Sequence, residues 1–175
     1  MLKKLIGDTR GVSAIEFAFI APVMIMFYLG MAELTMGLMA ERRSSHAASA
    51  IGDLVAQSQS LTNSDVDDIF EIADELVKPS SVATLRSCVV SIQANNQGAA
   101  QVKWSRTHRD PSDCPTSGAI SVPANLIAAN EGLVMSEVQY DYTSPIANYL
   151  PAPVTFKERF YLKPRQSTWV KLTAD

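Results

Sequence analysis

The chain has few of the residues that enzyme and metal sites are usually built from. Its 175 residues include two histidines and two cysteines. It contains no Gly-rich phosphate loop and no His-Glu-x-x-His, Gly-x-Ser-x-Gly or Cys-x-x-Cys motif. We interpret His46 and His108 as surface residues. A metal site made of His108 and the two cysteines would lack paired-ligand spacing. The sequence therefore predicts no catalytic residue, no metal and no cofactor.

Basic residues are also scarce. The chain has 15 Lys and Arg against 18 Asp and Glu, a net charge of -3. Nucleic-acid-binding domains are usually basic, so we predict no nucleic-acid partner. The charges are unevenly placed, with acidic residues crowding residues 65–75 and basic residues dominating 157–171. Two arrangements remain open: the groups pair with one another, within the fold or between subunits, or they form two solvated faces.

What the sequence does have is one long apolar segment near its start. From Val12 to Ala40 the chain is apolar except for two short hydroxyl side chains and the carboxylates of Glu16 and Glu33. As a helix it would be about 40 Å long, more than the roughly 30 Å of bilayer hydrocarbon. One span is therefore enough, and both glutamates can lie near the interfaces. Pro22 should kink or loosen the helix, because proline lacks the backbone N–H.

Glu16 is the unusual residue of this segment. A carboxylate costs roughly 2.5–3.5 kcal/mol at the centre of a membrane helix, so by default it marks a functional site. If the chain were cut after Gly11, the new ammonium of Val12 would lie four residues before Glu16. That spacing is one helical turn on the same face. The sequence therefore predicts a cut that creates the partner charge of Glu16.

The start of the chain resembles a prepilin processing site. It has a basic leader that ends at Gly11, then four residues, then Glu16 and Phe17, and then an apolar helix. The sequence from Gly11 to Pro22 is similar to that of the TadE-like minor pilins (pseudopilins) of the tight-adherence, or Tad/Flp (type IVc), pilus system. Members of that family commonly show an Ala-(Val/Ile/Leu)-Glu-Phe-Ala run followed by Ala-Pro, as this chain does. The resemblance covers about the first forty residues.

The resemblance implies a processing site made of Gly11, Val12, Glu16 and Phe17, cut after Gly11 by a prepilin peptidase. It implies a structural subunit, not an enzyme, that helps to assemble a pilus used in adhesion and surface attachment. The implied partners are other minor pilins, the major pilin, the inner-membrane assembly platform and membrane lipid. The implied location is the bacterial inner membrane, with a single span, a cytoplasmic N-terminus and a periplasmic C-terminal domain.

Three other interpretations remain open. One is an uncleaved single-pass envelope protein whose exported domain binds a partner or ligand, and another is an exported hydrolase on a membrane tether. A secretory signal peptide also has a basic start and an apolar middle, and residues 38–40 loosely imitate its cleavage site. We prefer a retained anchor, because the apolar segment is too long for a signal peptide and contains Glu16.

The periodicity divides the chain into a leader at 1–11, a helix at 12–57 and an exported domain at 58–175. Apolar residues recur at helical spacing through residues 47–55, which predicts that the membrane helix continues into water as an amphipathic rod. An exported pair of cysteines in a small domain is typical of a disulfide, so we predict a Cys88–Cys114 bond. Two reduced thiols are the alternative and would fit a cytoplasmic domain.

The exported domain is predicted to be α+β. An acidic helix over 65–77 is expected to be capped by Asn63 or Ser64 and ended by Pro79. After Pro79, apolar and polar residues alternate, which predicts an antiparallel sheet of about four strands with a hairpin turn at 95–98. The strands are expected at 88–94, 101–107, 133–142 and 155–163. A short helix is expected within 122–130. Three aromatic side chains on these strands are interpreted as core or partner surface: Trp104, Tyr140 and Tyr142.

Overall fold

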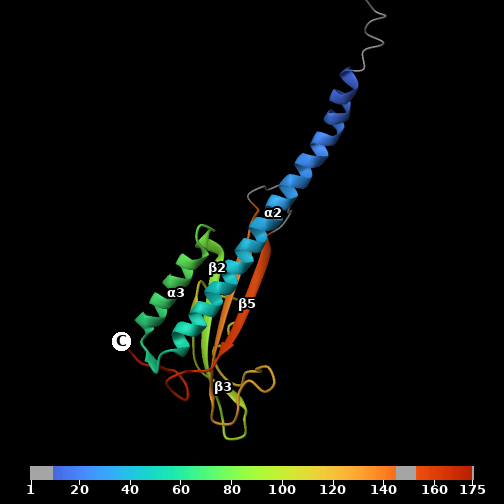
Figure 1. Ribbon diagram of the computed structural model, residues 1–175. Coiled ribbons are helices and arrows are strands. Elements are labelled where there is room, and N and C mark those ends of the chain that lie inside the picture. The colour runs from blue at the N-terminus through green and yellow to red at the C-terminus, as the bar shows by residue number, and fades with distance from the viewer. Residues whose placement is uncertain (1–9, 145–152, 175) are drawn as a thin grey trace, which may run out of the picture.

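The computed structural model describes residues 10–144 and 153–174, and it begins with one long helix. Helix α2 runs from Arg10 to Ala56 without interruption, through Pro22. Its first half extends away from the rest of the protein, and its second half lies against a sheet (Figure 1). The prediction that the apolar helix continues beyond residue 40 as one long helix is therefore confirmed.

The sheet has four antiparallel strands in the order β3-β2-β4-β5. Their bounds are Leu85–Ala94 for β2, Ala100–His108 for β3, Gly132–Tyr142 for β4 and Val154–Leu162 for β5. The β2–β3 turn falls at residues 95–98, as predicted. The side-chain oxygen of Asn95 accepts hydrogen bonds from the N–H groups of Gln97 and Ala99, both at 2.9 Å. The predicted α+β class is confirmed.

Helix α2 and the acidic helix α3 (Asn63–Val77) cover the same face of the sheet. Their apolar residues meet those of the strands in one core, which includes Ile51, Val55, Val66, Phe70, Val89, Val134 and Val138. The helix approaches the sheet closely at Gly52. A Cβ atom there would lie 2.7 Å from the Oγ of Ser136. That hydroxyl donates a 2.7 Å hydrogen bond to the Ala48 carbonyl, so the helix and β4 are joined at this point.

The cap of α3 is Thr62, and the prediction of Asn63 or Ser64 was wrong. The Thr62 hydroxyl accepts from the N–H of Asp65 at 3.1 Å, and the Asp65 carboxylate accepts from the N–H of Thr62 at 2.8 Å. This reciprocal arrangement is a capping box, which satisfies two helix-terminal donors at once. The N–H of Thr62 and, in addition, the Thr62 hydroxyl donate to the Asp65 carboxylate, and these two bonds lower the pKa of Asp65.

The loop between β3 and β4 covers the other face of the sheet. It packs Cys114, Ile120, Val122, Leu126 and Ile127 against a second cluster of buried strand residues. No helix forms at 122–130, contrary to the prediction. Pro123 cannot donate a backbone hydrogen bond, and Asn125 and Asn130 have φ angles of 66° and 65°, in the left-handed region that ends a right-handed helix.

The predicted bond between Cys88 and Cys114 is present, with a Cα–Cα distance of 6.0 Å. It ties the covering loop to β2. A loop of this length contributes about 3 kcal/mol through the entropy of the unfolded chain. We therefore expect the double variant Cys88→Ser, Cys114→Ser to lose about 3 kcal/mol of unfolding free energy, measured by urea denaturation. Reduction of the natural protein should cause a similar loss; an unchanged midpoint in both cases would contradict this.

The C-terminal segment adds a short parallel pair that the sequence did not predict. Strand β1 (Ser60–Leu61) pairs with β6 (Lys171–Leu172). Beside it, the carbonyl of Val170 accepts hydrogen bonds from Trp104 Nε1 at 2.8 Å and from the Ser91 hydroxyl at 2.9 Å. Trp104 is thus a core residue, one of the two alternatives proposed for it.

Among the described residues of one chain, no ion pair joins the acidic helix to the basic C-terminal strand. Acidic side chains of α3 instead meet the end of the sheet. Asp67 bonds Arg106 at 2.8 Å, and Asp74 bonds Arg109 at 2.6 Å. His108 stacks on Phe70 with ring centroids 5.5 Å apart. His108, interpreted as a surface residue, is half-buried against Phe70, whereas His46 is exposed on α2 as predicted.

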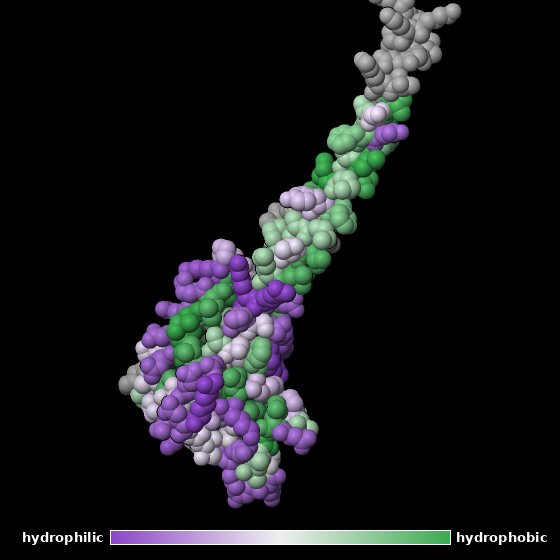
Figure 2. All heavy atoms as spheres, in the orientation of Figure 1, coloured by the Kyte–Doolittle hydropathy of each residue, from purple (hydrophilic) through white to green (hydrophobic). Residues whose placement is uncertain are grey.

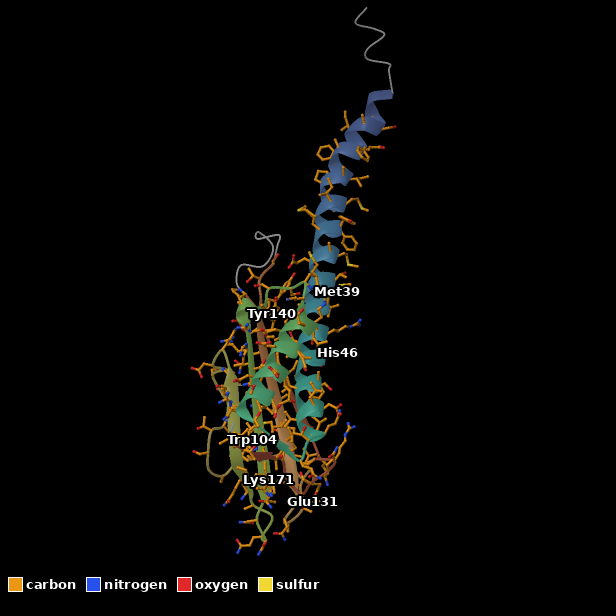
Figure 3. The ribbon with its side chains drawn as sticks, turned by 90° about the vertical axis from the view of Figure 1, so that its left-hand side faces the viewer. Met39, His46, Trp104, Glu131, Tyr140 and Lys171 are labelled. Atoms are coloured by element: carbon orange, nitrogen blue, oxygen red, sulfur yellow. A yellow bond between two sulfur atoms is a disulfide. The ribbon has the colours of Figure 1, made fainter. Side chains whose placement is uncertain are left out.

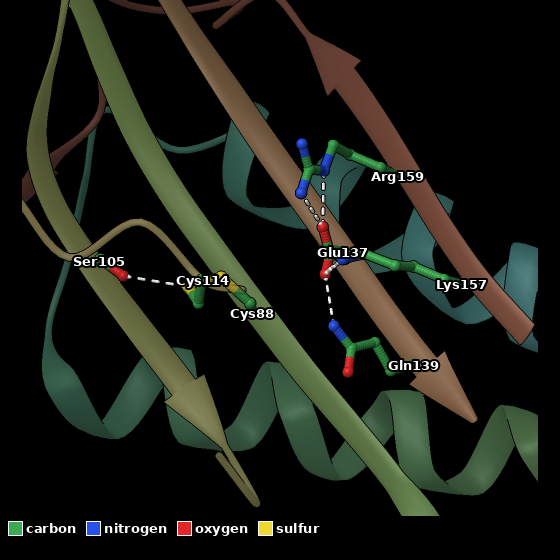
Figure 4. The surroundings of a disulfide bond; sticks show 7 residues. All are labelled: Cys88, Ser105, Cys114, Glu137, Gln139, Lys157 and Arg159. Carbon is green, nitrogen blue, oxygen red and sulfur yellow. Dashed lines mark hydrogen bonds and ion pairs between the residues drawn. A yellow bond between two sulfur atoms is a disulfide. The ribbon is translucent and has the colours of Figure 1, made fainter. Parts of the chain in front are cut away.

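On the outer face of the sheet, Glu137 is fully buried. Its carboxylate accepts from Arg159 Nε at 2.6 Å and from the amide of Gln139 at 2.8 Å (Figure 4). Lys157 lies 3.3 Å away and also bonds Asp113. Because a buried charge is tolerated only when it is paired, these basic residues of β5 are required by Glu137 and are not simply solvated.

Candidate functional site

The first half of α2 has an apolar surface that no described residue covers. The side chains of residues 12–39 are mostly exposed, including Phe17, Phe19, Phe27 and Tyr28, each at least 66% exposed. Figure 2 shows this part of the helix as almost continuously hydrophobic up to the polar surface of the domain. Within the described residues it is the helix long and apolar enough to cross a membrane, a property that signal sequences share.

The predicted processing residues lie at the start of this exposed helix. Val12 and Phe17 are 51% and 70% exposed, and Glu16 is exposed too. Val12 and Glu16 are both helical and four residues apart, so they lie one turn apart on one face. Across residues 10–144 and 153–174, Glu16 has no ion-pair or hydrogen-bond partner. Cleavage after Gly11 stays a prediction.

The second glutamate of the apolar segment, Glu33, is held by the domain. It is 6% exposed, and its Oε1 accepts a 3.0 Å hydrogen bond from the hydroxyl of Tyr142, at the end of β4. Burial and the neighbouring carboxylate disfavour the phenolate and raise the pKa of Tyr142 to about 12. Oε2 of Glu33 is also buried, and no described residue bonds to it.

The contact between Glu33 and Tyr142 joins the anchor to the sheet, and sequence reasoning missed it. Glu33 was expected near a membrane interface, and Tyr142 was interpreted as core or partner surface. The two residues are 109 positions apart. Nothing in the period of either segment indicates the pairing, because periodicity reports which face is buried and not what that face meets.

Two hollows flank α2 at this level. A cavity of about 360 Å³ lies between the helix and the β4–β5 pair, lined by Gly30, Glu33, Leu34, Gly37, Leu38, Glu41, Tyr142, Val154 and Phe156. A groove of about 640 Å³ lies on another side of the helix. Met39 and Tyr140, which Figure 3 shows at a similar height along the helix, both line the groove. The end of the sheet therefore reaches the apolar part of α2.

The described residues offer no arrangement suited to catalysis by a metal. Within 10–144 and 153–174, no three His, Cys, Asp or Glu side chains are grouped so that they would hold an ion. The buried carboxylate of Glu137 is neutralised by its neighbours, and both cysteines are in the disulfide. The most distinctive feature of the described residues is an exposed apolar helix whose second half is packed into a folded domain.

The described part of the chain is thus an α+β domain whose core includes the second half of an exposed, apolar N-terminal helix. Residues 11–52 match the family described as TadE-like protein. The N-terminal part of the chain is thus a TadE-like family domain. The match begins at Gly11, at the predicted cut, and ends at Gly52, where the helix approaches the sheet. Comparison with curated proteins and with solved structures finds no match.

Proposed function

We propose that this protein is a minor pilin, or pseudopilin, that acts as a membrane-anchored structural subunit in the assembly of a Tad/Flp-type pilus. The observation that carries the proposal is the Gly11-to-Glu16 spacing at the start of a bare apolar helix, inside a TadE-like family domain. Through the pilus, the protein contributes to adhesion and surface attachment. No step of this function needs a reacting group.

In this proposal the bare half of α2 spans the bacterial inner membrane once. The basic leader residues Lys3, Lys4 and Arg10 favour a cytoplasmic N-terminus. The sheet and α3 are then periplasmic, where a disulfide such as Cys88–Cys114 persists. The exposed side chains of the helix contact lipid before assembly and neighbouring subunits after it.

Processing creates the charge that Glu16 needs. The prepilin peptidase cuts after Gly11, and the ammonium of Val12 then faces a carboxylate one turn away or the Glu16 of a neighbouring subunit. In a membrane, desolvation makes an unpaired carboxylate costly and its pairing correspondingly specific. Glu16 is exposed and has no partner among the described residues, which supports this role. The proposed partners are the peptidase, the major pilin, other minor pilins and the inner-membrane assembly platform.

The N-terminus of the protein purified from its native membrane tests the proposal. We expect N-terminal sequencing and intact mass to give Val12 as the first residue. The variant Gly11→Leu should retain the leader and start at Met1, because the residue at the cut has changed. The matched change Gly7→Leu, also in the leader, should still give Val12.

Two other results would favour other functions. A natural protein that starts at Met1 would point to an uncleaved single-pass envelope protein whose domain binds a partner or ligand. A start near Glu41 would point to a secreted domain released by a signal peptidase. In that case α2 would lose the segment that carries Glu33, and the domain would lose its contact with Tyr142.

A further inference from the structure

A polar hollow lies at the turn between β2 and β3, at the end of the molecule opposite to the exposed half of α2 (Figure 1). Its volume is about 480 Å³, within the range of small-molecule sites, roughly 300–1,000 Å³. Lys103 lines it, together with six carboxamide side chains: Gln93, Asn95, Asn96, Gln97, Gln101 and Asn130. We propose that this hollow binds an acidic saccharide, whose hydroxyls contact the carboxamides and whose carboxylate contacts Lys103.

The concentration of carboxamides indicates a ligand that is rich in hydroxyl groups. These six side chains are nearly half of all the Asn and Gln residues of the chain. A carboxamide has an oxygen that accepts and a nitrogen that donates, and each hydroxyl of a sugar also does both. Ala94 is the one apolar residue among the described lining residues, so an acyl chain or an apolar peptide side chain would meet almost no apolar wall. The lining therefore matches a saccharide better than a lipid or an apolar peptide.

Part of this lining is held in place by the turn itself. The side-chain oxygen of Asn95 accepts from the N–H groups of Gln97 and Ala99, which leaves its amide nitrogen to donate to a ligand. The Asn95 carbonyl accepts from the N–H of Gly98 at 2.9 Å and from the N–H of Asn130 at 3.4 Å. The second of these bonds fixes Asn130 beside the turn. Groups that are already in place lose little conformational entropy when a ligand binds.

Lys103 indicates that the saccharide is acidic. Its side chain is exposed, and its Nζ lies 5.6 Å from the centre of the Trp169 ring. Within residues 10–144 and 153–174, no carboxylate pairs with Lys103 and none lines the hollow, whereas the nearby Lys163 bonds Glu131 at 2.7 Å. A carboxylate on the sugar would give Lys103 a charge-assisted hydrogen bond and would meet no like charge in the hollow. Uronic acids have this combination of hydroxyls and a carboxylate.

The position of the hollow suits a ligand outside the membrane. In the proposed anchored state, the β2–β3 turn points away from the bilayer, because the exposed half of α2 leaves the opposite end of the molecule (Figure 1). The inference goes beyond the proposed function, and it rests on that function only for this orientation. Binding itself uses residues of the sheet and its turn, none of which belongs to the anchor.

The test is a titration of the full-length protein in detergent with a tetramer of galacturonic acid. Because Lys103 lies over Trp169, we expect a saturable change in tryptophan fluorescence, and isothermal titration calorimetry gives an independent Kd. Lys103→Gln should weaken binding about tenfold by calorimetry, since it removes the charge. Gln101→Ala should weaken binding about fivefold, through the loss of one neutral hydrogen-bonding group. Lys78→Gln changes an exposed lysine at the end of α3 and should leave the Kd unchanged.

Two further probes separate charge from hydroxyl recognition. Maltotetraose has the hydroxyls without the charge and should bind about tenfold more weakly; a short polyglutamate has the charge without the hydroxyls and should not compete. Equal binding of either probe would overturn the inference, as would an unchanged Kd in Lys103→Gln or no saturable binding at about 10 mM ligand. The titration needs neither a pilus nor a cleaved N-terminus. A protein that starts at Val12 but binds no saccharide would therefore contradict this site and leave the proposed function standing.

Discussion

Glu16→Ala is expected to leave membrane insertion intact and to abolish pilus assembly. Removal of the carboxylate makes the helix more apolar, so insertion becomes easier. The new ammonium of Val12 then has no partner in the membrane. Breaking a buried pair by removing one member costs about 3–5 kcal/mol, which is at least a hundredfold in the equilibrium for docking a subunit. The effect is therefore large and specific to assembly.

The measurement is the number of pili per cell by electron microscopy, together with membrane fractionation and the N-terminal residue of the variant. Glu71→Ala serves as the matched control, because Glu71 is an exposed glutamate on α3 and has no place in the charge pair. Normal piliation in Glu16→Ala, with the variant cleaved at Val12, would end the charge-pairing explanation. Loss of the variant from the membrane would show that Glu16 acts in insertion.

Gly132→Ala is expected to be the most damaging small substitution in the sheet. A Cβ atom at Gly132 would fall on the carbonyl oxygen of Thr168 and lie 2.8 Å from the Cα of Trp169. Both obstacles are backbone, so the C-terminal segment must move as a unit. That movement disturbs the Val170 carbonyl, which accepts from Trp104 and Ser91. Overpacking of this kind typically costs 1–3 kcal/mol, and we expect about 3 kcal/mol here.

Chemical denaturation followed by Trp fluorescence measures the effect, because Trp169 is part of the displaced segment and Trp104 donates a hydrogen bond to it. Gly37→Ala is the control for the same chemical change. Its Cβ would make only an ordinary contact, 3.9 Å from Tyr142 Cε1, so it should not destabilise the protein. Equal midpoints for Gly132→Ala and the natural protein would show that the C-terminal segment packs elsewhere in solution.

The helices and strands were predictable where the spacing of apolar residues keeps one period, helical or alternating. The apolar run and the spacing of Ile51 and Val55 predicted α2 almost to its end, because a helix needs only one buried stripe. Alternation predicted all four strands to within a few residues. The turn at Asn95–Gly98 followed from its chemistry, since Gly98 adopts a φ of 80°.

The features that were predicted wrongly or missed depend on partners distant in sequence or on competing local hydrogen bonds. Thr62 became the cap because Asp65 completes the reciprocal box, whereas Asn63 or Ser64 would have shortened the helix. The contact of Glu33 with Tyr142 and the stacking of His108 on Phe70 need the finished sheet. The predicted processing residues, by contrast, form a local pattern within seven consecutive positions, 11–17, and cleavage there stays a prediction.

The uninterrupted course of α2 has a mechanical consequence. The same helix supplies the exposed apolar segment and part of the core of the domain, and Ser136 is bonded to its backbone. A pull on the anchor therefore loads the helix–sheet contact in shear along its whole length, which resists force better than a contact peeled open from one end. A turn of the anchor about its axis turns the sheet by the same angle. The orientation of the domain is therefore set by the orientation of the exposed half of α2.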